Sequence, residues 1–212
     1  MLTVHHLATS QSDRIVWLCE ELGIAYELKR YERDPVTRLA PAEYQALHPI
    51  GTAPVITDGD LVLGESAAIV EYIIQRHGGG RLAVPPSAPG YADYVFWFHF
   101  ANGSFMPSAM MGLVARMAAA NGPEAAKSLN RRLDRAWDLV EARLGESPYL
   151  AGEEFTAADI MTLFPMTTMR LFAPRDLTSY PNVRRYLQTI GARPAFQRAM
   201  AKADPGFVVP LT

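Results

Sequence analysis

Hydroxyl side chains gather in the segment Thr9-Ser10-Gln11-Ser12, between the first expected strand and the first expected helix. The first turn of a helix has free amides, and the helix dipole favours negative charge there. Hydroxyls and amides that meet at such a point could hold an anion. A plain cap is the alternative, in which Ser12 or Ser10 only satisfies the amides of the helix.

A proline marks the start of the third expected strand, in the segment Ala53-Pro54-Val55. Proline is tolerated at a strand start because its missing N–H removes little from the ladder there. If the peptide bond before Pro54 is cis, the backbone N–H and C=O of Ala53 point outward and can pair with a peptide-like ligand. Only about 5–6% of such bonds are cis, so the local sequence leaves the isomer open.

An acid and a hydroxyl, Glu65 and Ser66, stand at the mouth of the next expected helix. The first-turn amides and the Ser66 hydroxyl could receive a carboxylate, while Glu65 could receive an ammonium group. Together they could hold an amino-acid head group. The alternative is an ordinary N-cap at Ser66 with an exposed acid beside it.

The histidines and the cysteine favour structural roles. His5 and His6 are neighbours on an expected strand, so their side chains should point to opposite faces, and no histidine has a metal-ligand spacing. We therefore expect no metal site. The single cysteine, Cys19, lies on the apolar stripe of the first expected helix, where a thiol is usually a buried core residue rather than a nucleophile.

Two patterns divide the chain into a mixed α/β part and an all-α part. Residues 1–77 predict the order βαβαββα, with strands over 2–7, 26–31, 54–57 and 61–63. Residues 78–90 are rich in Gly and Pro and predict a linker. From 91 to 212 only helical patterns remain, and the predicted helices cover 91–120, 123–144, 157–171, 182–190 and 194–203.

Composition limits the classes of protein that this chain can belong to. It has 212 residues, of which 49% are hydrophobic, so it can bury a core. Its 20 basic and 22 acidic residues nearly cancel, which argues against a nucleic-acid binder. No apolar run is long enough for a membrane span, and the first residues do not resemble a signal peptide. With one cysteine and no internal disulfide, a cytoplasmic location is expected.

Three sequence anchors, taken together, resemble the glutathione S-transferase superfamily, in its cytosolic, bacterial type. They are HPIGTAPVI at 48–56, the Glu-Ser pair at 65–66 leading into AAIVEYI, and FTAADI at 155–160. The resemblance implies a thioredoxin-like domain with a cis-proline before its third strand, followed by an all-helical domain. It also implies a homodimer that uses glutathione as co-substrate. Thr156 and Asp159 would form the family's capping box, which is a folding device.

The resemblance also implies roles for individual residues in the first domain. Glu65 and Ser66 would hold the γ-glutamyl group of glutathione, and the backbone of Ala53, beside Thr52 and Pro54, would pair with its cysteinyl part. Many relatives carry a basic side chain near the glycyl carboxylate, where this chain has Gly51-Thr52.

The family's catalytic position follows the first strand, and here Ser10 matches it best, which indicates the serine type. An offset of one or two residues would move the role to Thr9 or Ser12. A free thiol has a pKa of about 8.5 and reacts as its thiolate, so Ser10 would stabilise the thiolate by a hydrogen bond. The resemblance then implies conjugation of glutathione to hydrophobic electrophiles, a detoxification reaction.

The electrophile would lie against the helical domain, near an interruption at Asn102-Gly103 and Pro107. Candidate contacts there are Asn102, Phe105, Met106 and Met110, with Phe98 nearby. Residues of these types at helical spacing more often belong to a core, so the core is the alternative for each.

Two other functions remain open on the same scaffold. One is glutathione-dependent isomerisation or thiol reduction, although residues 9–12 include no cysteine for a reductase. The other is a non-catalytic binding or assembly module. The presence of Ser10, Glu65 and Ser66 argues against that module, because a scaffold needs none of them.

Overall fold

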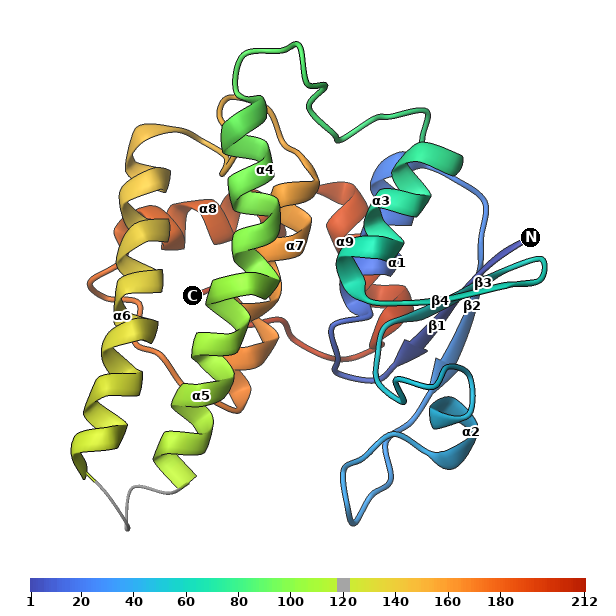
Figure 1. Ribbon diagram of the computed structural model, residues 1–212, viewed down its shortest axis with the longest axis horizontal. Coiled ribbons are helices and arrows are strands. Elements are labelled where there is room, and N and C mark those ends of the chain that lie inside the picture. The colour runs from blue at the N-terminus through green and yellow to red at the C-terminus, as the bar shows by residue number, and fades with distance from the viewer. Residues whose placement is uncertain (118–122) are drawn as a thin grey trace. The chain divides into compact units, whose positions relative to one another are not determined.

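The computed structural model describes residues 1–117 and 123–212, which form two compact units (Figure 1). One unit comprises residues 1–82 and 192–209, and the other comprises 83–191 and 210–212. The helix predicted over 194–203 therefore groups with the sheet, whereas the domain limits predicted at 77 and 91 stay a prediction. Residues 118–120 of the helix predicted over 91–120 lie outside the described part of the chain.

The first unit has the thioredoxin-like order βαβαββα, as predicted, followed by a later helix. Its elements are β1 (Leu2–Leu7), α1 (Asp13–Leu22), β2 (Glu27–Tyr31), α2 (Ala42–Gln45), β3 (Val55–Asp58), β4 (Leu61–Gly64), α3 (Ser66–Arg76) and α9 (Pro194–Ala203). The strands lie in the order β2-β1-β3-β4. Strand β1 runs parallel to β2 and antiparallel to β3, and β3 and β4 form an antiparallel hairpin.

The alternation of β1 sends its side chains to two different environments. On one side, Leu7 packs with Tyr31, Tyr44 of α2 and Val55. On the other side, the His6 side chain is fully buried and contacts Ser12, which directly precedes α1. Neighbouring residues of one strand thus serve an apolar core and a polar cluster.

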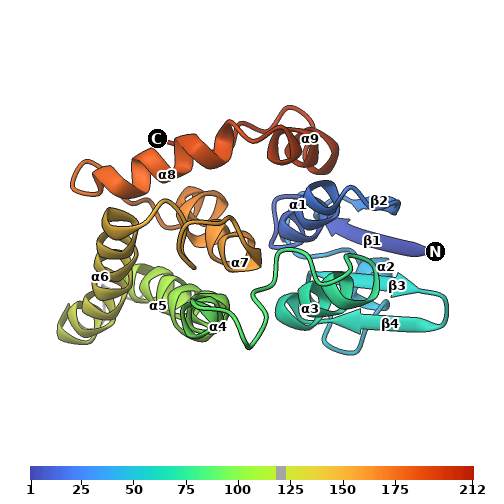
Figure 2. The same ribbon diagram turned by 90° about the horizontal axis from the view of Figure 1, so that it is seen from above.

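Ion pairs fasten α9 to α1. Glu21 forms a two-point pair with Arg193 at 2.7 and 2.8 Å, and Glu20 pairs with both Arg198 and Lys202. The two glutamate side chains are only 8% exposed, so these pairs are partly shielded from water. Figure 2 shows α9 lying beside α1. This attachment carries the residue that follows α9, Asp204, to the end of β1.

The second unit is helical, which confirms the predicted fold class. Its elements are α4 (Tyr91–Phe100), a π-helix η1 (Ala101–Phe105), α5 (Met106–Met117), α6 (Pro123–Glu146), α7 (Ala157–Met166), a 3-10 helix η3 (Thr168–Leu171) and α8 (Pro181–Gly191). Within the described residues, no helix is both long and apolar enough to cross a membrane.

Two of the predicted helices are divided in the structure. The helix predicted from residue 91 changes to π geometry at η1, just ahead of Pro107, which has no N–H to continue the α-helical pattern. The helix predicted over 157–171 ends early, because Thr167 leaves the helical backbone with φ −122° and ψ −100°.

The capping box predicted at the start of α7 is present. The Thr156 side chain accepts the Ala158 N–H at 3.3 Å, and Asp159 accepts the Thr156 N–H at 2.9 Å. Asp159 is fully buried and also accepts hydrogen bonds from the Leu150 N–H and the Tyr186 hydroxyl, both at 3.0 Å. The motif therefore joins the loop before α7 and helix α8 to the start of α7.

Candidate functional site

The loop after β1 is held on two sides by polar contacts. Thr9 has a left-handed backbone with φ 52°, and its N–H donates to the Asp204 carboxylate at 3.1 Å. The Arg33 guanidinium donates to the backbone oxygens of Ala8 and Thr9, at 2.9 and 3.3 Å. Thr9 is not a glycine, yet it keeps a left-handed backbone because its N–H and the carbonyl oxygens of Ala8 and Thr9 all have hydrogen-bond partners.

Ser10 and Ser12 form a buried pair of hydroxyls in this loop. Ser12 is at the N-cap position of α1, but its side chain caps no amide of the helix. Its Oγ instead accepts the Leu7 N–H at 3.0 Å and lies 2.8 Å from Ser10 Oγ. The Ser12 N–H donates to Ser10 Oγ at 3.2 Å. The cap interpretation therefore does not describe the Ser12 side chain.

The serine pair continues into a histidine and an aspartate. His6 Nδ1 lies 2.9 Å from Ser12 Oγ, and His6 Nε2 lies 3.2 Å from the Asp204 carboxylate. The His6 and Asp204 side chains are 0% and 9% exposed. Burial alone would raise the pKa of Asp204, but its contact with His6 and the Thr9 amide bring that pKa below its usual value. Ser10, Ser12, His6 and Asp204 thus form one continuous row.

Sequence reasoning does not single out two members of this row. The sequence spacing of His6 argues only that it is not a metal ligand. Its position, one residue before the end of a strand that leads into a hydroxyl-rich loop, could have indicated a contact with those hydroxyls. Asp204 lies 195 residues from its partner Thr9, so no local pattern could connect them. His5, by contrast, contacts the Tyr31 and Thr57 hydroxyls, at 3.0 and 3.2 Å, as expected for the opposite face of β1.

The register of the sheet brings the three predicted features to the same end. Val55, which starts β3, pairs with His5 near the end of β1 and with Gly64 at the end of β4. The loop after β1, the Ala53-Pro54 peptide and the Glu65-Ser66 pair therefore lie at one end of adjacent strands. The Ala53-Pro54 peptide bond is cis, as the resemblance implies.

The N-cap of α3 lies one residue earlier than predicted, at Glu65 rather than at Ser66. The Glu65 carbonyl accepts the Ile69 N–H at 3.0 Å, so the helical hydrogen bonds start at Glu65. Glu65 has φ 67°, which is uncommon for a residue with a side chain. Its side chain is exposed, whereas Ser66 is buried in the first turn. The acid and the first-turn amides remain adjacent, as the sequence suggests.

A basic side chain that sequence reasoning does not single out lies against the end of β4. A Cβ on Gly64 would stand only 3.3 Å from His48 Nδ1, so a glycine allows the imidazole to approach this closely. The Ile50 N–H donates to His48 Nδ1 at 3.2 Å. Nδ1 is therefore the acceptor nitrogen in this contact. Gly51 and Thr52, which offer no basic group, follow directly.

Cys19 is enclosed in the core. It is fully buried in α1, and burial raises the pKa of its thiol to about 12. A thiol with such a pKa is protonated near neutral pH and is a poor nucleophile. In the part of the chain that the structure describes, no three His, Cys, Asp or Glu side chains are grouped as metal ligands would be.

The predicted electrophile contacts divide into core and surface residues. Phe105 is fully buried and packs against Phe100 and Trp137, and Met106 belongs to a cluster with Phe164. These two side chains are therefore core residues, in line with the alternative reading of their spacing, as is the buried Phe98. Asn102 is half-buried, and Met110 is 43% exposed.

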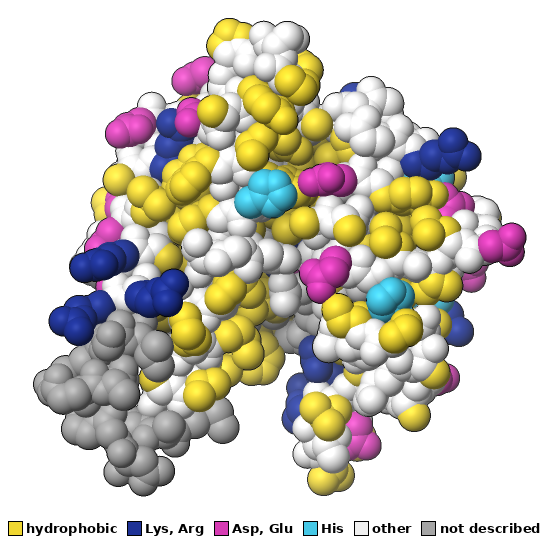
Figure 3. All heavy atoms as spheres, viewed as in Figure 1, with side chains coloured by type: hydrophobic (Ala, Val, Ile, Leu, Met, Phe, Trp, Pro, Cys, Tyr) yellow, Lys and Arg dark blue, Asp and Glu magenta, His cyan; other side chains and the backbone are white. Residues whose placement is uncertain are grey.

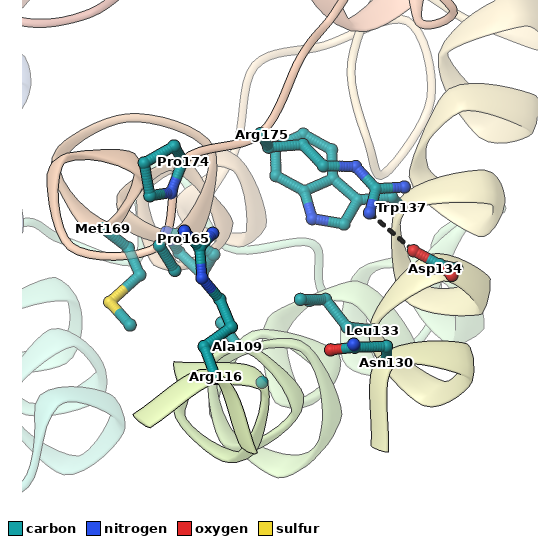
Figure 4. Close-up of a pocket in the computed structure, with 12 residues that line it drawn as sticks. Ala109, Arg116, Asn130, Leu133, Asp134, Trp137, Pro165, Met169, Pro174 and Arg175 are labelled. Carbon is teal, nitrogen blue, oxygen red and sulfur yellow. Dashed lines mark hydrogen bonds and ion pairs between the residues drawn. The ribbon is translucent and has the colours of Figure 1, made fainter. Parts of the chain in front are cut away.

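The helical unit has a separate cavity of about 280 Å³ that none of these four candidates lines (Figure 4). Apolar side chains of α5, α6, α7 and the region after α7 form most of its wall, and Arg116 reaches into it. Arg175 is already paired with Asp134 at 2.5 Å and lies over the Trp137 ring. The Arg175 guanidinium therefore already has an acidic partner and an aromatic partner within the protein.

Comparisons with known proteins agree with the fold of both units. The family models for the glutathione S-transferase N-terminal and C-terminal domains match residues 4–81 and 105–194. Glutathione S-transferase 3 of Schizosaccharomyces pombe is 34% identical, over 96% of this chain and 88% of its own length. Glutathione S-transferase 3 of Zea mays is 31% identical, over 89% and 87%.

Among solved structures, a glutathione S-transferase from Actinobacillus pleuropneumoniae superposes with a TM-score of 0.89 at 34% identity. The alignment covers 97% of this chain and 95% of that one. Both halves of the chain and nearly its whole length therefore match one family, whose substrate is glutathione. The protein belongs to the glutathione S-transferase family and is an enzyme of that family.

Proposed function

We propose that this enzyme conjugates glutathione to hydrophobic electrophiles and that Ser10 stabilises the reacting thiolate. The observation that carries the proposal is the shared position, at one end of the sheet, of the loop with Ser10, the Ala53-Pro54 peptide and Glu65-Ser66. The Ser10 loop offers a hydroxyl for a thiol, Ala53 offers a backbone for a peptide, and Glu65-Ser66 offer an acid and first-turn amides for an amino-acid head group.

Each part of glutathione has a proposed partner. Exposed Glu65 receives the ammonium of the γ-glutamyl group, while Ser66 and the first-turn amides of α3 receive its carboxylate. The backbone of Ala53 pairs with the cysteinyl part, beside Thr52 and Pro54. His48, which lies against Gly64, supplies the basic side chain that Gly51 and Thr52 do not offer.

The chemical step follows from the properties of a thiol. With a pKa of about 8.5, a free thiol is mostly protonated near neutral pH, so a hydrogen bond to sulfur raises the reactive fraction. The Ser10 hydroxyl donates that bond, and the thiolate then attacks the electrophile. Asn102 and Met110 of the helical unit, which keep accessible surface, are assigned to electrophile contact. A buried Cys19 gives no support to a thiol-reductase reaction.

Titration of enzyme-bound glutathione tests this proposal. The ultraviolet absorbance of the thiolate should rise with pH at a lower midpoint on the enzyme than in water. A hydrogen bond to a charged group contributes about 1.5–3 kcal/mol, so Ser10→Ala should raise that midpoint by about one to two units. Cys19→Ala should leave it in place. A shift in Thr9→Val or Ser12→Ala but not in Ser10→Ala would move the role to the other hydroxyl.

The proposal includes a homodimer in the cytoplasm with a role in detoxification. Large apolar side chains are exposed along α4 and α5, where Figure 3 shows hydrophobic surface: Tyr91, Phe96 and Val114 are 37%, 51% and 58% exposed. A second copy of the chain could cover such a patch, as is common in symmetric dimers. Because the reaction consumes a reduced thiol, a reducing compartment suits it.

A further inference from the structure

Ionisation of the thiol leaves a proton that must go somewhere. A serine hydroxyl is a poor base, so Ser10 cannot keep it. The same row contains a base that can take up the proton, the imidazole of His6, which lies on the far side of Ser12 from Ser10. A role for His6 in taking up this proton rests on the proposed function, in which glutathione binds beside Ser10.

The contacts around the two serines are fully used when His6 is neutral. When the neutral imidazole carries its proton on Nε2, 3.2 Å from the Asp204 carboxylate, Nδ1 is an acceptor. Ser12 then donates to Nδ1 at 2.9 Å, with the Leu7 carbonyl oxygen as a more distant acceptor at 3.4 Å, and accepts from the Leu7 N–H and from the Ser10 hydroxyl. In this state the Ser10 proton points to Ser12. One Ser10 lone pair remains for the S–H of a bound thiol, since the other accepts the Ser12 N–H.

The same contacts are also fully used when His6 is doubly protonated, with the direction of the Nδ1–Ser12 and Ser12–Ser10 hydrogen bonds reversed. Nδ1–H donates to Ser12, Ser12 donates to Ser10, and the Ser10 hydroxyl proton is free to point at a thiolate. Both lone pairs of each serine oxygen are again occupied, by the Leu7 and Ser12 amides and by the neighbouring groups. The row therefore has two complete arrangements, which differ by one proton on His6 and one on sulfur.

We propose that His6 receives the proton of the glutathione thiol through Ser10 and Ser12, and that Asp204 neutralises the resulting imidazolium. The S–H bond breaks, each serine oxygen accepts one proton and passes on its own, and an Nδ1–H bond forms. No electron is exchanged and no further reactant is needed. Ser10 contacts the sulfur, whereas Ser12, His6 and Asp204 act as positioning residues behind it.

The charges that face His6 come from several elements. Asp204 after α9 and Asp13 of α1 favour an imidazolium, and burial raises the pKa of Asp13 to about 6. Arg14 of α1, Arg30 of β2 and Arg33 after β2 lie around the two carboxylates and act in the opposite sense. Of these charged groups, Asp204 is the one that makes the direct contact with His6, at 3.2 Å.

The test counts protons when glutathione binds. Calorimetry near neutral pH, in buffers with different heats of ionisation, gives the number released, and S-methylglutathione, which has no thiol, corrects for every other group. For the wild type, which forms the bound thiolate, we expect a difference between the two ligands of about zero protons. The matched control is His5→Gln, because His5 is the neighbouring histidine on the other face of β1 and touches neither serine. It should behave as the wild type.

Two variants break the row at different points. His6→Gln removes the acceptor, and Ser12→Ala removes the link but leaves the His6–Asp204 pair. Both should release about one proton for each thiolate formed, and the midpoint for thiolate formation should rise by about one unit or more. A purely structural role would change the melting temperature but not the number of protons.

The number of protons that the wild type releases shows whether His6 accepts the thiol proton, even where a variant fails to fold. If the wild type binds glutathione as a thiolate and releases about one proton, His6 does not accept it and the inference is overturned, while the proposed function stands. If the wild type binds glutathione without forming a thiolate, or does not bind it, the proposed function fails first.

Discussion

Replacing Asp159 by alanine should destabilise the protein without removing any group from the proposed glutathione site. Asp159 is fully buried and accepts hydrogen bonds from the backbone N–H groups of Leu150 and Thr156 and from the Tyr186 hydroxyl. Alanine would leave two buried amides without their partner. Each such loss costs about 1–3 kcal/mol, so we expect about 2–6 kcal/mol, well above the roughly 1 kcal/mol of an ordinary cap.

Urea unfolding followed by circular dichroism measures this loss, and Asp176→Ala is the matched control. Asp176 is exposed and accepts hydrogen bonds within its own turn, from the N–H and hydroxyl of Thr178. Its replacement should cost less than about 1 kcal/mol. A loss below about 1 kcal/mol in Asp159→Ala would refute the reasoning, as would normal stability combined with lost turnover.

The same carboxyl should give the stability a defined pH dependence. Burial raises the pKa of Asp159 from 3.8 to about 6, although its hydrogen bonds act in the opposite direction. The folded protein then binds this proton more tightly than the unfolded chain, so the contribution is complete below pH 3.8 and is lost as the pH rises through 6. The wild type should lose about 3 kcal/mol relative to Asp159→Asn across this window. A constant difference between the two proteins would contradict the assignment.

Two further predictions concern binding and assembly. Glu65→Ala and Ser66→Ala should each weaken glutathione binding about tenfold or more in calorimetry, because each removes a charge-assisted contact worth about 1.5–3 kcal/mol; unchanged affinity in both would reject the head-group site. Phe96→Ser should weaken self-association in sedimentation equilibrium, since Phe96 is 51% exposed on α4, whereas Val36→Ser, at an 88% exposed valine of a loop, should not.

Much of the fold could be predicted because local rules determine it. Strand alternation and Gly23 located β1 and the end of α1, and the Thr156 to Asp159 spacing located the capping box. Local rules failed where the backbone departs from a regular helix. Neither the π geometry of η1 nor the bend at Thr167 has a periodic signature, although Pro107 gave a hint of the first.

The candidate site was predictable only where its residues are neighbours in sequence. Glu65-Ser66 and Ala53-Pro54 were found as adjacent pairs. Asp204 could not be found, because α9 reaches the end of β1 through ion pairs between segments that lie more than 170 residues apart. His48 was missed because its relation to Gly64 depends on the close approach of a loop to β4.

A crystal structure of the enzyme with glutathione bound would show directly which side chain contacts the sulfur. We expect the sulfur to lie within hydrogen-bond distance of Ser10 Oγ, with the γ-glutamyl group at Glu65-Ser66 and the cysteinyl backbone paired with Ala53. A sulfur nearest to Thr9 would shift the catalytic position by one residue. A sulfur bonded to Cys19, or a glutathione bound away from this end of the sheet, would rule out thiolate stabilisation by Ser10.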